Sequence, residues 1–244
     1  MTAPTTHPTL PDVAGVRRRR RRQQSHRRRL AVGAAVVVVL AALGWLIGFS
    51  PLLAVDRVEV TGTGQLSVDQ VMAAAAVPLG QSLLQVDPAA IAARVETLDP
   101  VAQADVSRHL FGTVAIAVTE RVGLYALAQG SSWQLVDIEG RAFLALAEPP
   151  AGLLPVTMPE PSPRLQADVA TVVAALPAVV KDQTTAVTAD SADHIELTLI
   201  SGATLFWGDA AQSDLKAEAA AALLALVPAS HYDVSAPAYP AVRP

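Results

Sequence analysis

The 244-residue sequence contains no cysteine, only two lysines, and few aromatic residues, which make up 4% of the chain. The absence of cysteine excludes disulfide bonds, thiol catalysis and cysteine-ligated metal sites. Any folded part of this chain is therefore held together by non-covalent packing and hydrogen bonds.

Motifs of common catalytic and ligand sites are missing as well. The sequence has no G-x-S-x-G for a serine nucleophile, no H-x-x-x-H pair for a metal, and no G-K-[ST] after the TGTG at 61–64. Of the histidines beyond residue 50, His109 precedes a predicted turn and His194 lies on the polar face of a predicted strand, so we expect both at the surface. The sequence predicts no catalytic residue, no metal site and no cofactor.

One long uncharged run, residues 30–49, directly follows nine arginines at 17–22 and 27–29. A helix with a rise of about 1.5 Å per residue and this length reaches about 30 Å, the thickness of a bilayer's hydrocarbon core. Arginines beside a first apolar segment stay in the cytoplasm, so we predict a single transmembrane helix at 30–50 with the amino terminus inside. A cleaved signal peptide is the main alternative, although its apolar region usually has about 7–15 residues; a buried core helix is the other.

Charge is distributed unevenly along the chain. Residues 1–50 carry a net charge of +8 and residues 51–244 a net charge of −12. Arginine clusters can bind nucleic acid, but beside a membrane segment they are more simply explained by anionic lipid, so we predict no nucleic-acid partner. Residues 1–29 are predicted to form a disordered basic cytoplasmic tail, because their start is rich in Pro and Thr and poor in large apolar residues.

The first part of the outer region is predicted to have the order strand, helix, helix, strand, strand. Ser67, three residues before Gln70, forms the capping box of the first helix, and Asp87-Pro88 begins the second. Strands are expected near 55–61, 101–109 and 113–120, with alternating apolar residues on one face.

The region after Arg121 is predicted to be a β-rich domain with two helices, at 165–176 and 212–227. Its strands are expected at 122–128, 133–137, 141–144, 184–189, 194–200 and 203–207, and the Pro-rich segment 147–163 is expected to be a connection. The residues of the last helix expected to face the core are Leu215, Ala219, Ala222, Leu223 and Leu226. Residues 231–236 are predicted to form a strand at a sheet edge, because prolines follow it.

Four charged residues are interpreted as structural or left open. Asp137 is expected to accept backbone hydrogen bonds in a turn, and Glu120 and Arg121 to set the geometry of the junction between the two regions. Lys216 either pairs with an acidic partner or is a solvated helix residue.

Several short stretches outside the apolar run are distinctive: VDRVEVTG at 55–62, SVDQV at 67–71, SLLQVD at 82–87, VSRHLFGTVAIAVTER at 106–121, LVDIEGRAF at 135–143 and YDVSAP at 232–237. Together they resemble the FtsQ/DivIB family of bacterial cell division proteins. Sixteen arginines against two lysines indicate a GC-rich genome and favour an actinobacterial member. The sequence departs from the family's usual pattern at Phe111-Gly112 and at Gly123, where proline is common.

The resemblance implies an α+β fold class, with a single transmembrane helix followed by a POTRA domain (β-α-α-β-β) at 55–122 and an FtsQ-type β domain at 123–244. It also implies a non-enzymatic bitopic scaffold of the divisome in the cell (inner) membrane, with the carboxyl-terminal domain extracytoplasmic and the protein enriched at the septum. Such a scaffold links early and late division proteins. Its implied partners are FtsB/DivIC, FtsL-like small coiled-coil proteins and other divisome membrane proteins.

An exposed strand edge offers unpaired backbone groups to which a partner strand can bind. The predicted edge strand at the carboxyl terminus is therefore the predicted partner-binding site. The predicted contact residues are Lys216, Tyr232, Val234, Ser235, Ala236 and Tyr239. In one alternative, the segment only closes the sheet. In another, the chain is a secreted or membrane-tethered envelope protein with binding or hydrolytic activity.

Overall fold

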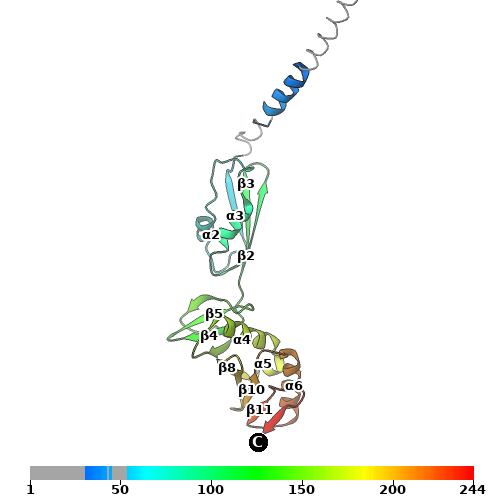
Figure 1. Cartoon of the computed structure of the whole chain (residues 1–244). Coiled ribbons are helices and arrows are strands. Elements are labelled where there is room, and N and C mark those ends of the chain that lie inside the picture. Colours follow the sequence, from blue (N-terminus) through cyan, green and yellow to red (C-terminus); the bar gives the residue numbers. More distant parts are fainter. Residues whose placement is uncertain (1–30, 43, 46–53) are drawn as a thin grey trace, which may run out of the picture. The chain divides into compact units, whose positions relative to one another are not determined.

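The computed structural model describes residues 31–42, 44–45 and 54–244 (Figure 1). The predicted cytoplasmic tail lies outside these residues, and the predicted span at 30–50 is described only in part. Residues 31–42, 44 and 45 are helical and exposed. Among the described residues, no helix combines the length and the apolar character that crossing a bilayer requires.

The order of elements predicted for the first part of the outer region is confirmed. The elements are β1 (Arg57–Thr61), α2 (Val68–Ala75), α3 (Pro88–Val95), β2 (Val101–His109) and β3 (Thr113–Glu120), and the strands form a sheet in the order β1-β3-β2. Helix α2 begins with the predicted capping box, in which the Ser67 hydroxyl accepts the Gln70 N–H and the Gln70 side chain accepts the Ser67 N–H. The small core comes from the apolar positions of these elements, including Val71, Ala75, Ile91, Val95, Val114, Ile116 and Val118.

The described chain forms two compact units. One combines the residues up to Arg57 with the loops 78–87 and 108–114, and the other contains the remaining segments. In the first unit the Val55 N–H donates to the Gln81 carbonyl (2.8 Å), and the Asp56 N–H donates to the Gly112 carbonyl (2.8 Å). These bonds hold both loops to the segment at 54–57.

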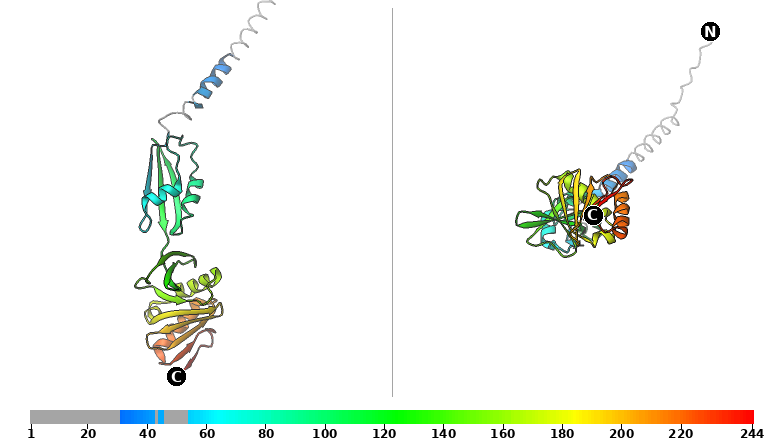
Figure 2. Two further views of the ribbon diagram at one scale, coloured as in Figure 1. Left: turned by 90° about the vertical axis from the view of Figure 1, so that its left-hand side faces the viewer. Right: turned by 90° about the horizontal axis from the view of Figure 1, so that it is seen from below.

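The carboxyl-terminal region contains a nine-stranded mixed sheet in the order β12-β11-β10-β9-β8-β7-β4-β5-β6 (Figures 1 and 2). Its strands are β4 (Tyr125–Gln129), β5 (Ser132–Val136), β6 (Ala142–Leu146), β7 (Leu154–Thr157), β8 (Thr184–Ser191), β9 (His194–Leu199), β10 (Thr204–Gly208), β11 (His231–Asp233) and β12 (Ala241–Arg243). The pairs β4/β7, β7/β8 and β10/β11 are parallel, and the other neighbouring pairs of this sheet are antiparallel. Two strands were not predicted: β7 lies inside the Pro-rich connection, and β12 lies between Pro240 and Pro244.

Three helices, rather than the two predicted, accompany this sheet: α4 (Pro163–Ala175), α5 (Ala178–Lys181) and α6 (Ser213–Leu226). Figure 1 shows them on the same side of strands β8, β10 and β11. Helix α4 buries the face predicted for it, with Leu165, Val169, Val172 and Leu176 in the core. Helix α5 was missed because its single turn is too short for an apolar period.

The predicted inward face of α6 is wrong for three of its five residues. Leu215 and Leu226 are 51% and 78% exposed, and Ala222 is exposed as well. The other two, Ala219 and Leu223, are partly buried and pack against the core. The buried residues are Ser213, Lys216, Ala217 and Ala220. Small side chains on this face let the helix pack closely against the domain. The polar atoms of Ser213 and Lys216 find hydrogen-bond partners within the domain. Close packing, rather than the number of large apolar residues, therefore decided which face is buried.

Candidate partner-binding surface

The predicted edge strand is not at the edge of the sheet. Strand β11 pairs in parallel with β10 and antiparallel with β12, so both of its sides are occupied. The prediction failed because the chain reverses direction at residues 236–240 and adds β12 outside β11. At this end of the sheet the edge is therefore β12.

The backbone groups of β12 that face away from β11 can be identified from hydrogen bonding. The Val234 N–H donates to the Phe206 carbonyl (3.0 Å), so Val234 bonds toward β10. Because successive residues of a strand bond in opposite directions, Asp233 bonds toward β12, where it pairs with Ala241. The N–H and carbonyl of the next residue, Val242, consequently face away from the sheet.

The predicted contact residues of the terminal segment divide into buried and exposed groups. Val234 is fully buried, and Tyr232 is buried with its hydroxyl donating to the Val227 carbonyl and accepting the Ala229 N–H, both at 2.9 Å. Ser235, Ala236 and Tyr239 are exposed, and Tyr239 reaches 86%. Only this second group presents side-chain surface, and the binding roles of all five stay predictions.

Lys216 is neither a solvated helix residue nor a free cation. Its side chain is buried, and its ammonium donates to the Asp209 carboxylate (2.6 Å) and to the Asp209 carbonyl (2.9 Å). The hydrogen bond from Lys216 lowers the pKa of Asp209, and this effect exceeds the opposing desolvation. Lys216 thus anchors α6 to the segment after β10, and its predicted contact with a partner stays a prediction.

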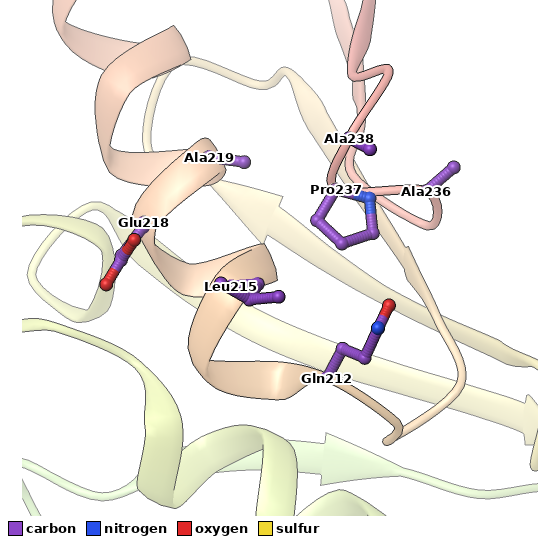
Figure 3. A pocket seen from close by; sticks show the side chains of 7 residues that line it. All are labelled: Gln212, Leu215, Glu218, Ala219, Ala236, Pro237 and Ala238. Atoms are coloured by element: carbon purple, nitrogen blue, oxygen red, sulfur yellow. The ribbon is translucent and has the colours of Figure 1, made fainter.

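A groove of about 580 Å³ lies between α6 and the segment before β12 (Figure 3). It is lined by Gln212, Leu215, Glu218, Ala219, Ala236, Pro237 and Ala238. Figure 3 shows Leu215 and Ala219 facing Pro237 and Ala238 across the opening. The predicted contact Ala236 lies in this groove. The other lining residues were not predicted. Leu215 and Ala219 in particular were missed because helix periodicity assigned them to the core.

Glu120 and Arg121 bond to different segments. The Glu120 carboxylate accepts the N–H groups of Gly64, Gln65 and Leu66 at 2.8–3.1 Å. Burial raises the pKa of Glu120, but the three N–H donors outweigh it and lower the pKa overall.

The Arg121 guanidinium pairs with Asp137 and with Glu139. The turn assigned to Asp137 is confirmed, since its Oδ1 accepts the N–H groups of Glu139 and Arg141, both at 2.9 Å. In the part of the chain that the structure describes, no group of three or more His, Cys, Asp or Glu residues is placed to hold a metal ion.

Fold and surface together define a class of α+β protein: a β-α-α-β-β module followed by a mixed-sheet domain with a free strand edge and an adjacent apolar groove. Residues 53–121 match the family "POTRA domain, FtsQ-type", and residues 126–238 match "Cell division protein FtsQ/DivIB, C-terminal". The chain belongs to the FtsQ/DivIB family of bacterial cell division proteins. The resemblance inferred from its sequence is thereby confirmed.

Relatives in actinobacteria align with most of the chain. The cell division protein FtsQ of Streptomyces bingchenggensis is 37% identical over 210 residues, covering 81% of this chain and 79% of that protein. FtsQ of Mycobacteroides abscessus is 36% identical over 203 residues, covering 82% of this chain but only 65% of that protein. The major extracytoplasmic domain of DivIB from Geobacillus stearothermophilus matches 45% of this chain and 99% of that domain, with a TM-score of 0.36 and 16% identity.

Proposed function

We propose that this protein is a non-enzymatic, single-pass scaffold of the divisome that links early and late division proteins at the septum. Its family membership supports a role in cell division. In this proposal the basic residues 1–29 lie in the cytoplasm, residues 30–50 cross the cell membrane, and the remainder is extracytoplasmic. The uncharged run beside nine arginines supports this topology.

The carboxyl-terminal end of the sheet is the proposed binding site for FtsB/DivIC and FtsL-like proteins. The observation that carries this proposal is the free edge of β12, which ends the nine-stranded sheet. A partner strand can add to this edge by hydrogen bonding to Val242, while its side chains contact Tyr239 and the groove beside α6. The carboxyl-terminal segment therefore serves as a template for a strand of another protein.

Substitution Val242→Pro tests the docking mode. Proline removes the N–H that faces away from β11 but leaves the bonds of the flanking residues to β11 in place. We expect Val242→Pro to reduce capture of FtsB/DivIC and FtsL-like proteins by the full chain, whereas Val242→Ala retains capture. Equal capture by both variants would remove β12 as the docking strand. Thermal unfolding of the two variants checks that the domain remains folded.

The topology has its own test. Mass measurement of the mature chain from membranes should show that the amino-terminal segment is retained. Loss of about fifty residues would instead favour a cleaved signal peptide. A fluorescently tagged full chain is expected to collect as a ring at mid-cell, and turnover of a cell-wall substrate by the purified chain would contradict the non-enzymatic role.

A further inference from the structure

Four large apolar side chains are exposed on the two loops of the first compact unit. Leu79 and Leu84 belong to the loop 78–87, and Leu110 and Phe111 belong to the loop 108–114; their exposed fractions run from 61% to 83%. Residues 78–86 and 110–114 contain no charged side chain. Exposed apolar side chains on such uncharged stretches are typical of a surface that contacts an apolar partner.

These side chains are exposed although both loops are packed and hydrogen-bonded. Between the two exposed leucines, Leu83 is buried, and Val86 and Val55 are buried with it. The Arg108 guanidinium donates to the carbonyls of Leu83 (3.3 Å) and Val86 (3.4 Å), which ties the two loops together. The loops therefore present Leu79 and Leu84 on a folded support.

Phe111 is the strongest indicator, because the fold does not explain it. It adopts a φ of 70°, a conformation that bulky residues rarely occupy and that Gly or Asn would adopt more readily. With 83% exposure it buries little surface within the chain in return. An unfavourable backbone conformation combined with an exposed aromatic ring indicates a role outside the fold.

The chain itself limits where these loops can be. Ala54 forms a bridge with Ser82, and a Cβ at Gly112 would collide with the Ala54 carbonyl oxygen, so both loops lie against the start of the described outer segment. Only residues 50–53 separate Ala54 from the apolar run 30–49. Four residues span at most about 14 Å. The loops are therefore within a short reach of the end of that run.

We propose that Leu79, Leu84, Leu110 and Phe111 insert into the interfacial region of the extracytoplasmic leaflet and seat the POTRA-type module on the bilayer. This inference rests on the proposed membrane span. The occupant is lipid because the surface adjoins the predicted point of exit from the membrane, and because residues 78–86 and 110–114, which carry the four side chains, include no charged residue that would be costly to bury in a bilayer. The neighbouring Gln81, Ser82 and Gln85 are neutral polar residues suited to the headgroup region.

The absence of cysteine permits a direct test by single-site labelling of the full chain. Phe111→Cys and Leu84→Cys are each labelled with an environment-sensitive fluorophore and reconstituted into vesicles of phosphatidylglycerol and phosphatidylethanolamine carrying spin-labelled lipids. Ile200→Cys is the matched control, because Ile200 is also an apolar turn residue, 69% exposed, in the carboxyl-terminal domain. We expect a blue shift and loss of emission through lipid quenching at 111 and 84 but not at 200.

Flotation of the carbonate-washed vesicles separates the two proposals. If the chain floats with the vesicles but the probes at 111 and 84 stay unquenched, the lipid contact is wrong while the anchor stands. If the chain does not float, the span and the lipid contact both fall. Quenching that requires native membranes containing other division proteins would identify a protein as the occupant and would also overturn the lipid contact.

Discussion

Lys216 illustrates how one side chain can combine packing with charge. Its stem lies in the core beside Ala217 and Ala220, while its ammonium bonds twice to Asp209 at the end of β10. Burying an ammonium is costly unless it is paired, and the two hydrogen bonds to Asp209 offset this cost. Asp209 is half exposed and remains solvated on its other side.

Substitutions at Lys216 should separate the contribution of the stem from that of the charge. Lys216→Ala removes both and is expected to lower the free energy of unfolding by about 2–3 kcal/mol. Lys216→Met keeps the stem and lets water solvate Asp209, so its loss should be about 1 kcal/mol. Denaturant unfolding of the full chain in detergent measures both. Undiminished stability of Lys216→Ala would show that the pair contributes nothing.

Helix α6 shows why apolar periodicity can select the wrong face. Most of its positions are alanine or leucine, so apolar residues occur all around the helix and no single face is strongly favoured. The buried face consists of small residues with one satisfied lysine, and Leu215 is left to line the groove. The helix therefore lines the groove as well as contacting the core.

Arginine substitutions on opposite faces of α6 test this assignment. Ala220 is fully buried, so Ala220→Arg should prevent folding or cost more than about 4 kcal/mol. Ala222 is exposed, so Ala222→Arg should change stability by less than about 0.5 kcal/mol. The two substituted sites are only two residues apart in the helix, and thermal unfolding of the two variants measures the difference. Tolerance of arginine at 220 would show that the face is assigned incorrectly.

The stability of the whole chain should depend on pH through paired carboxylates. Glu120 and Asp209 both have lowered pKa values in the folded state, from ordinary values of 4.5 and 3.8. A carboxylate of this kind stabilises the fold above its unfolded pKa, and the contribution is lost as pH falls through the folded pKa. Acid should therefore weaken the attachment of the 64–66 segment to the end of β3 and of α6 to Asp209.

The variant Glu120→Gln isolates the contribution of Glu120 to this pH dependence. Chemical unfolding at pH 7 should show it to be less stable than the wild type. Between pH 5 and about pH 3 the difference should shrink, because the wild-type carboxyl becomes protonated. A difference that stays constant over this range would mean that the charge of Glu120 does not stabilise the fold.

Much of the fold was predictable from local patterns. The capping box at Ser67, the alternating strands β3 and β9, the buried face of α4 and the turn at Asp137 follow from short-range rules, and each is confirmed. The candidate surface was predictable only in part. The end of the chain was identified correctly as a sheet-forming region, but β12 escaped because its three residues are too few to carry an alternating pattern.

The sequence by itself determined the family, the order of the elements from β1 to β3 and the absence of cysteine chemistry, because these depend on residue identity and spacing along the chain. The tertiary structure alone decided that β12 covers β11, that Tyr232 and Val234 are buried, and that Leu215 faces a groove. Each of these outcomes depends on which surfaces fit together when segments far apart in sequence meet. Local periodicity carries no information about that fit.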